Sequence, residues 1–147
     1  MGGSVSSALE ELRLADHMLY VTFPLLDDKR VFLNAVNHLG NAIKIVIRDF
    51  MRLETDYKRL SFMPSEDLLI NEFVSKYATR LGLSTFIEMI KSVTSFNNVR
   101  SRSSIKLKKN EKFIVISPEY SMVVLSIGEA KSFVRQAKDF INQMSVI

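Results

Sequence analysis

The sequence predicts an all-α fold, a four- or five-helix bundle with a small β-hairpin before the C-terminal helix. Apolar residues recur every three or four positions over most of the 147 residues, as in amphipathic helices. This helical period gives way to short β-prone runs between residues 113 and 125. The contents of 47% apolar and 24% charged residues are typical of a folded globular chain. We expect one helical domain at 7–147 after a flexible leader at 1–6.

The first helix is expected from about Ser7 to Thr22. Ser7 and Glu10 have the spacing of a capping box, in which each side chain binds a free backbone N–H. Pro24 is expected to end this helix, because the residue before a proline avoids helical geometry. The start, Met1-Gly2-Gly3, matches the N-myristoylation pattern, so a lipidated terminus stays open beside the leader.

A long second helix is expected to begin at Asp27 or Asp28 and to reach about Tyr57. Its apolar residues step by three and four without a miss from Val31 to Met51, which favours the central helix of a bundle. Gly40 costs about 1 kcal/mol relative to alanine in the middle of a helix, so we expect a close helix contact there.

Three further helices are expected along the rest of the chain. The third begins at Ser65 and ends before Gly82, a residue type suited to a left-handed C-terminus. The fourth begins with a Thr85–Glu88 capping box and frays near Asn97. The last begins with a Ser126–Glu129 capping box after strands predicted at 113–116 and 122–125.

The segment 100–112 lacks a helical apolar period and predicts an exposed basic loop. Against Glu111 alone it carries six basic side chains, which supply the whole formal net charge of +4: Arg100, Arg102, Lys106, Lys108, Lys109 and Lys112. Clustered Lys and Arg neutralise phosphates, so these side chains are candidates for binding a polyanion. With no aromatic residue between 99 and 112, binding would depend on the nucleic-acid backbone and on salt. The alternative is a solvated loop without a ligand.

The polar face of the second helix is the other candidate site. Its residues follow helical steps beside the apolar stripe: Asn34, Asn37, His38, Asn41, Lys44 and Arg48. They predict a polar groove for a ligand or an RNA backbone, with His38 as its titratable member. A wet helix face, or a subunit contact satisfied by amide hydrogen bonds, is the alternative.

Composition excludes several kinds of chemistry. Without cysteine there can be no disulfide and no thiolate metal site, and two histidines, His17 and His38, are too few for a usual zinc site. No phosphate-binding glycine loop, nucleophile elbow or zinc-protease motif is present. We therefore expect no catalytic residues, no metal and no cofactor. No run of about 18 apolar residues predicts a transmembrane segment, and a cytoplasmic location is expected.

The order of elements resembles the HEPN superfamily of small helical domains, which frequently dimerise. The resemblance rests on the long central helix and on the terminal helix from Glu129 to Ile141. Catalytic members carry Arg and His separated by four to six residues, whereas Arg30 and His38 are separated by seven. The resemblance therefore implies a member without the catalytic site.

Three functional hypotheses follow. The first is a non-catalytic binding module that contacts RNA or another polyanion, such as an acidic protein, through the basic segment. The alternative is a protein–protein interaction or self-assembling module, such as a homodimer, without a nucleic-acid role. A hydrolase centred on His38 ranks last, because no nucleophile or metal ligand accompanies that side chain.

Overall fold

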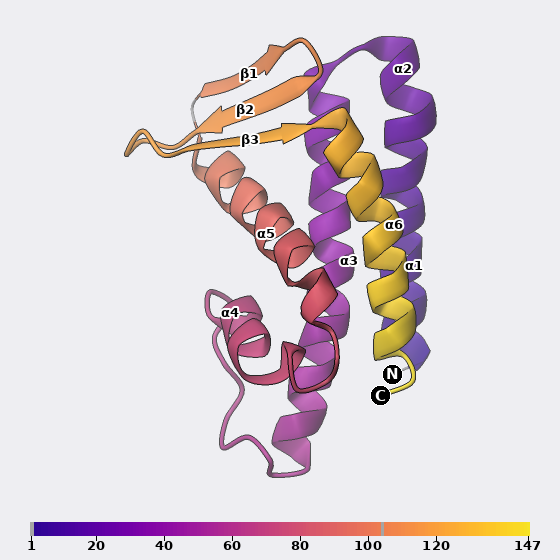
Figure 1. Cartoon of the computed structure of the whole chain (residues 1–147), viewed down its shortest axis with the longest axis vertical. Helices are drawn as coiled ribbons and strands as arrows, with labels where there is room; N and C mark the ends of the chain where they lie inside the picture. Colours follow the sequence, from indigo (N-terminus) through magenta and orange to yellow (C-terminus); the bar gives the residue numbers. More distant parts are fainter. Residues whose placement is uncertain (1, 104) are drawn as a thin grey trace.

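The computed structural model describes residues 2–103 and 105–147. Three long helices lie side by side, namely α1 (Gly2–His17), α3 (Lys29–Asp56) and α6 (Ile127–Met144), and α5 (Ile87–Arg102) runs diagonally across α3 (Figure 1). A small antiparallel sheet lies at one end of the bundle. The mainly helical class is confirmed, but the sheet means that the fold is not purely all-α.

The first helix is longer at both ends than the sequence predicts. It begins at Gly2, so the expected leader is wrong over residues 2–6, and Met1 lies outside the described residues. Ser7 therefore sits inside the helix, and Glu10 binds Arg13 instead of a backbone N–H. At the other end the chain passes through η1 (Met18–Thr22) into α2 (Phe23–Leu26).

Pro24 does not end the helix, because the turn before it is a π-turn. The N–H of Phe23 binds the carbonyl oxygen of Met18, five residues earlier. This wider turn carries the chain past the proline ring and its missing N–H. The helix ends instead at Asp27, whose φ of 47° is left-handed.

Helix α3 follows the prediction closely. Asp28 is its N-cap, accepting a hydrogen bond from the backbone N–H of Arg30 at 2.9 Å, and Tyr57 is its C-cap. Its apolar stripe is buried from Phe32 to Met51, and Val31 is half-buried. The expected contact at Gly40 is confirmed, because an added Cβ would lie 2.4 Å from Nδ2 of Asn97 on α5. That nitrogen donates a hydrogen bond to the carbonyl oxygen of Val36 at 3.0 Å.

The middle of the chain is less regular than predicted. The third helix is shorter, comprising α4 (Leu69–Phe73) and η2 (Val74–Ala78), and its N-cap Leu68 has no side-chain bond, so Ser65 does not cap it. A short turn, η3 (Ser84–Phe86), takes the place of the Thr85 capping box. Helix α5 does not fray near Asn97, because the bond to Val36 holds that residue against α3. Gly82 is left-handed as predicted, with φ of 76°.

The sheet contains one more strand than predicted. Its order is β1 (Ile105–Lys109), β2 (Lys112–Ile116) and β3 (Met122–Ser126), with both pairings antiparallel. The β2–β3 hairpin is confirmed, and so is the Ser126–Glu129 capping box of α6. A two-residue turn with Asn110 at φ 58° joins β1 to β2.

The basic segment is therefore not a loop, which corrects the prediction. Residues 100–102 are the end of α5, residues 105–109 and 112 lie in strands, and Ser104 lies outside the described residues. Ile105 and Leu107 pair with Ile116 and Ile114 of the apolar strand β2. Such cross-strand apolar pairs outweigh the local preference of a lysine-rich segment for loop structure.

An aromatic cluster attaches the sheet to the helices. The ring of Phe113 on β2 stacks on Phe32 of α3 with a centroid distance of 3.7 Å. It also meets the edge of Phe23 on α2 at 5.6 Å, and Phe32 contacts Phe96 of α5 at 6.2 Å. Because strand side chains alternate between faces, burying Phe113 turns Val115 and Leu125 towards the helices as well.

We predict that Gly40→Ala lowers the free energy of unfolding by about 1–2 kcal/mol despite the better helix propensity of alanine. The new methyl group would displace the Asn97 amide from Val36. In an Asn97→Ala background the same change should be neutral or stabilising by up to about 1 kcal/mol. Urea denaturation of the four proteins measures this coupling, and strictly additive changes would contradict the contact.

Candidate functional site

The six basic side chains predicted as one cluster are distributed over different parts of the structure. Arg100 reaches α3, where it donates to Oδ1 of Asn37 at 3.0 Å, and Arg102 pairs with Glu119 at 3.2 Å. Bonds from its own backbone and from the Ser117 hydroxyl, together with a smaller effect of Arg102, lower the pKa of Glu119. Both arginine side chains thus bond to other residues of the protein.

Lys106 and Lys108 lie on the inner side of β1, which faces the helices. The ammonium group of Lys108 binds Asp27 at 2.6 Å and lies 5.7 Å from the centre of the Phe23 ring. Lys29 donates to the backbone carbonyl of Lys106 at 2.9 Å. This side of β1 is thus held to the turn between α2 and α3.

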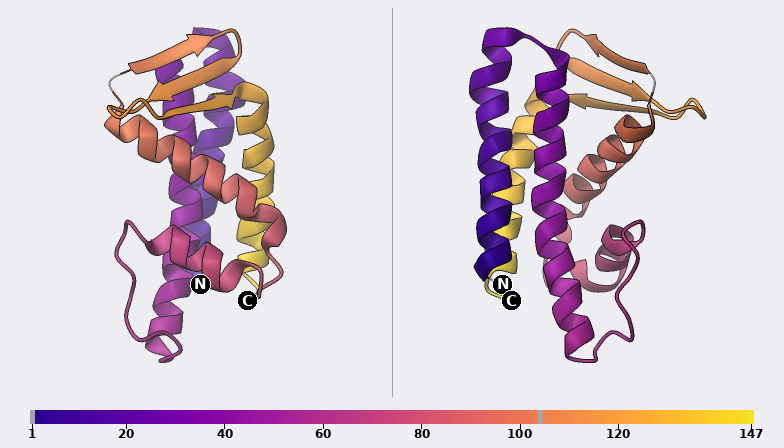
Figure 2. Two further views of the ribbon diagram at one scale, coloured as in Figure 1. Left: turned by 60° about the vertical axis from the view of Figure 1, so that its left-hand side comes forward. Right: turned by 180° about the vertical axis from the view of Figure 1, so that it is seen from behind.

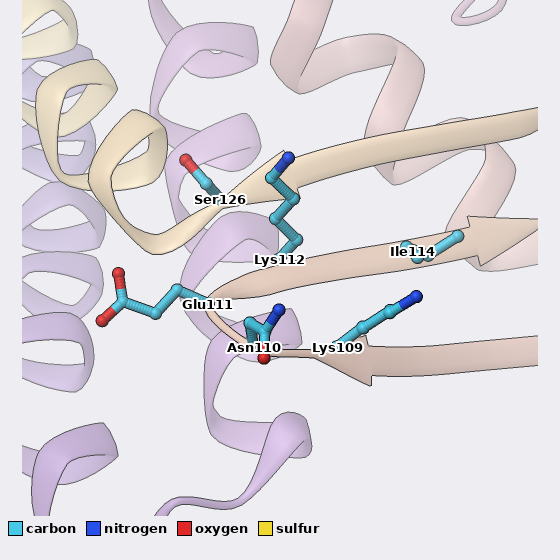
Figure 3. Close-up of a pocket in the computed structure, with 6 residues that line it drawn as sticks. All are labelled: Lys109, Asn110, Glu111, Lys112, Ile114 and Ser126. Carbon is cyan, nitrogen blue, oxygen red and sulfur yellow. The ribbon is translucent and has the colours of Figure 1, made fainter.

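Lys109 and Lys112 lie on the opposite, outer side of the sheet. They face each other directly across β1 and β2, and neither forms an ion pair with any residue the structure describes. Like charges directly opposite each other in a sheet are destabilising. Figure 3 shows both side chains beside Ile114, with Glu111 extending away from them.

The predicted polar groove on α3 is divided among three neighbouring segments. The imidazole Nδ1 of His38 contacts the carboxylate of Glu11 on α1, a partner that the sequence pattern did not reveal. Asn37 faces α5, and Arg48 binds Glu66 at 2.9 Å, the largest cause of the lowered pKa of Glu66.

Two further members of that face, Asn34 and Asn41, are exposed and half-buried respectively. Lys44 lines a cleft that has a volume of about 450 Å³. Helices α3 and α5 and residues 66–71 line this cleft, and Arg102 joins Lys44 there. The six residues do not form one groove.

The outer face of the sheet is an apolar surface that the helices leave uncovered. The strand register puts these six apolar side chains together: Ile105, Leu107, Ile114, Ile116, Met122 and Val124. The exposed fractions are 41% for Ile105, 49% for Leu107, 62% for Met122 and 39% for Val124. In the left view of Figure 2 the sheet lies in front of the helices, and no described element covers it.

We call these six side chains, with Lys109 and Lys112 at one end, the outer sheet surface. Around the two lysines it forms a depression of about 470 Å³ lined also by Asn110, Glu111, Ile114 and Ser126, with the Glu111 carboxylate extending away from the lysines (Figure 3). Residues of acidic type are absent from the nine outward positions of the strands. The surface is therefore apolar over most of its area and positively charged at one end.

The sequence contains a signal for this surface in its two apolar strand segments. Residues 113–116 and 122–125 are apolar without interruption. A strand with one face in water alternates apolar and polar residues, whereas continuous apolar runs are typical of strands covered on both faces. In this structure the helices cover only the inner face.

Two kinds of catalytic arrangement are not found among the described residues. No group of three or more His, Asp or Glu side chains among them is arranged to hold a metal ion. His38 contacts Glu11, but no serine or threonine of the described chain bonds to its ring, so a nucleophile–base pair is not formed. Within residues 2–103 and 105–147, no helix combines the length and the apolar character needed to cross a bilayer.

Comparison of the chain with protein-family models, with curated proteins and with solved structures finds no match. The resemblance to the HEPN superfamily therefore stays a prediction.

We predict that the same substitution, Val→Thr, changes the free energy of unfolding by different amounts on the two faces of the sheet. Val115 is only 1% exposed, so Val115→Thr buries a hydroxyl and should lower the free energy of unfolding by about 1–3 kcal/mol. Val124→Thr, on the outer face, should change it by no more than about 0.5 kcal/mol. Urea denaturation measures both. Equal losses would mean that the outer face is packed as closely as the inner one.

Proposed function

We propose that this protein is a non-catalytic binding module whose ligand is another protein, and that the outer sheet surface is its interface. The observation that supports the proposal is the uncovered apolar face of β2 and β3, strands whose sequences are typical of burial on both sides. Contiguous exposed apolar surface on a folded chain marks interaction sites.

A nucleic-acid role through residues 100–112 has less support. Arg100, Arg102 and Lys108 are engaged by Asn37, Glu119 and Asp27. The remaining lysines lie on both faces of the sheet, so they do not offer a continuous path for phosphates. The outer sheet surface also lacks an aromatic ring on which a base could stack.

Photo-cross-linking in the cells that produce the protein tests the proposal. With p-benzoylphenylalanine in place of Leu107, we expect a discrete adduct with a second polypeptide. Tyr57, which is 67% exposed at the far end of α3, is the matched control site and should give none. Val124→Glu should abolish the adduct, because it introduces a charge into the apolar surface. The absence of an adduct at Leu107 would refute the proposal.

Fluorescence anisotropy with mixed RNA and DNA pools tests the nucleic-acid alternative. We expect weak binding at low salt that disappears at physiological salt, because few cationic side chains are free to release counterions. Binding that persists at physiological salt, and is lost when Lys106, Lys108 and Lys109 are all neutralised, would favour the nucleic-acid role instead.

A further inference from the structure

We infer that the outer sheet surface binds one amphipathic α-helix of a partner protein, with acidic residues placed against Lys109 and Lys112. This inference rests on the proposed function and specifies the chemistry of the partner. Three properties of the surface support it, namely its size, its charge and the state of the sheet edges.

The size of the sheet suits a single helix. Five residues per strand span about 16 Å, and three strands about 4.8 Å apart span about 14 Å. A helix is about 10 Å wide, and three of its turns are about 16 Å long. The face measures roughly 230 Å², whereas a stable complex buries about 800 Å² on each partner. A helix confined to this face, like a second copy of this chain docked sheet to sheet, would therefore bind weakly without contacts beyond it, and the length and width of the face are what favour a single helix.

The charge of the surface specifies the polar side of that helix. Lys109 and Lys112 are directly opposite each other and without a carboxylate partner among the described residues. Their repulsion is relieved when a carboxylate of the bound helix lies between them. The other outward strand positions are apolar except for Ser126, so acidic residues are needed only at the lysine end.

The sheet edges favour a helix on the face over a strand added at an edge. Lys109 and Lys112 flank the two-residue turn, so the backbone groups of Lys106 and Lys108 point away from β2. Lys29 already binds the carbonyl oxygen of Lys106 at 2.9 Å. At the other edge, β3 runs beside α5 (Figure 1). The outer face is therefore the part of the sheet that is open to a partner.

The test uses two fluorescein-labelled peptides of about 18 residues, long enough for a marginal helix to form. Both carry leucines on one face, and the opposite face carries glutamates in one and lysines in the other. Wild-type protein should bind the glutamate peptide about three- to tenfold more tightly, as expected for two exposed ion pairs. Circular dichroism should show that this peptide becomes helical on binding.

Charge reversal provides the matched comparison. Lys109→Glu/Lys112→Glu should abolish or reverse the preference for the glutamate peptide. Lys58→Glu/Lys138→Glu makes the same change in net charge at exposed positions away from the sheet and should preserve it. Val124→Glu should weaken both peptides. Urea denaturation of each variant verifies that it is folded.

Several results would overturn the inference. These are equal binding of both peptides, no binding of either, or loss of the preference in the control variant. Binding to phosphatidylserine vesicles that requires Lys109 and Lys112 would identify a membrane surface instead. An adduct of two copies at Leu107 would identify a second copy. If neither peptide binds but Leu107 still cross-links to another protein, the proposed protein-binding function is supported and only the inference that the ligand is a helix is wrong.

Discussion

Burial of the Phe113 ring between Phe23 and Phe32 is the contact on which the arrangement of the sheet depends. Side chains of a strand alternate between its two faces, so fixing one residue inward fixes every other residue of the strand. With Phe113 inward, Ile114 and Ile116 must face outward, and pairing transfers the same alternation to β1 and β3. A slip of one residue would expose the ring and bury the lysines, so the register is strongly specified. The uncovered apolar face is thus a consequence of the core.

The helical part of the fold is the part that the sequence determines locally. The uninterrupted stripe of α3, its Asp28 cap and the Ser126–Glu129 capping box all depend on residues within a few positions of each other. The Gly40 contact was predictable because glycine is costly in a helix without a reason. The sequence predicts too short a first helix for two reasons. The capping-box spacing at Ser7 indicates a start there, although the helix begins upstream at Gly2, and a π-turn lets the chain continue in helical form past Pro24.

The candidate site depends on contacts distant in sequence, and this is why the pattern of charge alone misplaced it. The composition of residues 100–112 predicts a loop, since a segment with six cationic side chains and no helical period is usually solvated. The pairing of Leu107 with Ile114 makes this segment a strand, and alternation then sends Lys108 towards Asp27 and Lys109 into solvent. Nothing local to either lysine distinguishes them. His38 likewise acquires Glu11 as a partner only when α1 packs on α3.

The edge of the sheet is blocked by contacts with the helices whereas its outer face is left open, and this difference bears on function. An open strand edge invites unspecific pairing, and proteins commonly block it with lysine. Lys29 caps an outward carbonyl of β1, and the Lys108–Asp27 pair ties the same strand to the bundle. Among the outward strand positions, the only charged residues are Lys109 and Lys112, grouped at one end beside six apolar side chains that the described elements leave uncovered. Solubility alone would favour charges spread over that face. Apolar area with charge at one end instead provides both binding energy and a fixed orientation for a partner.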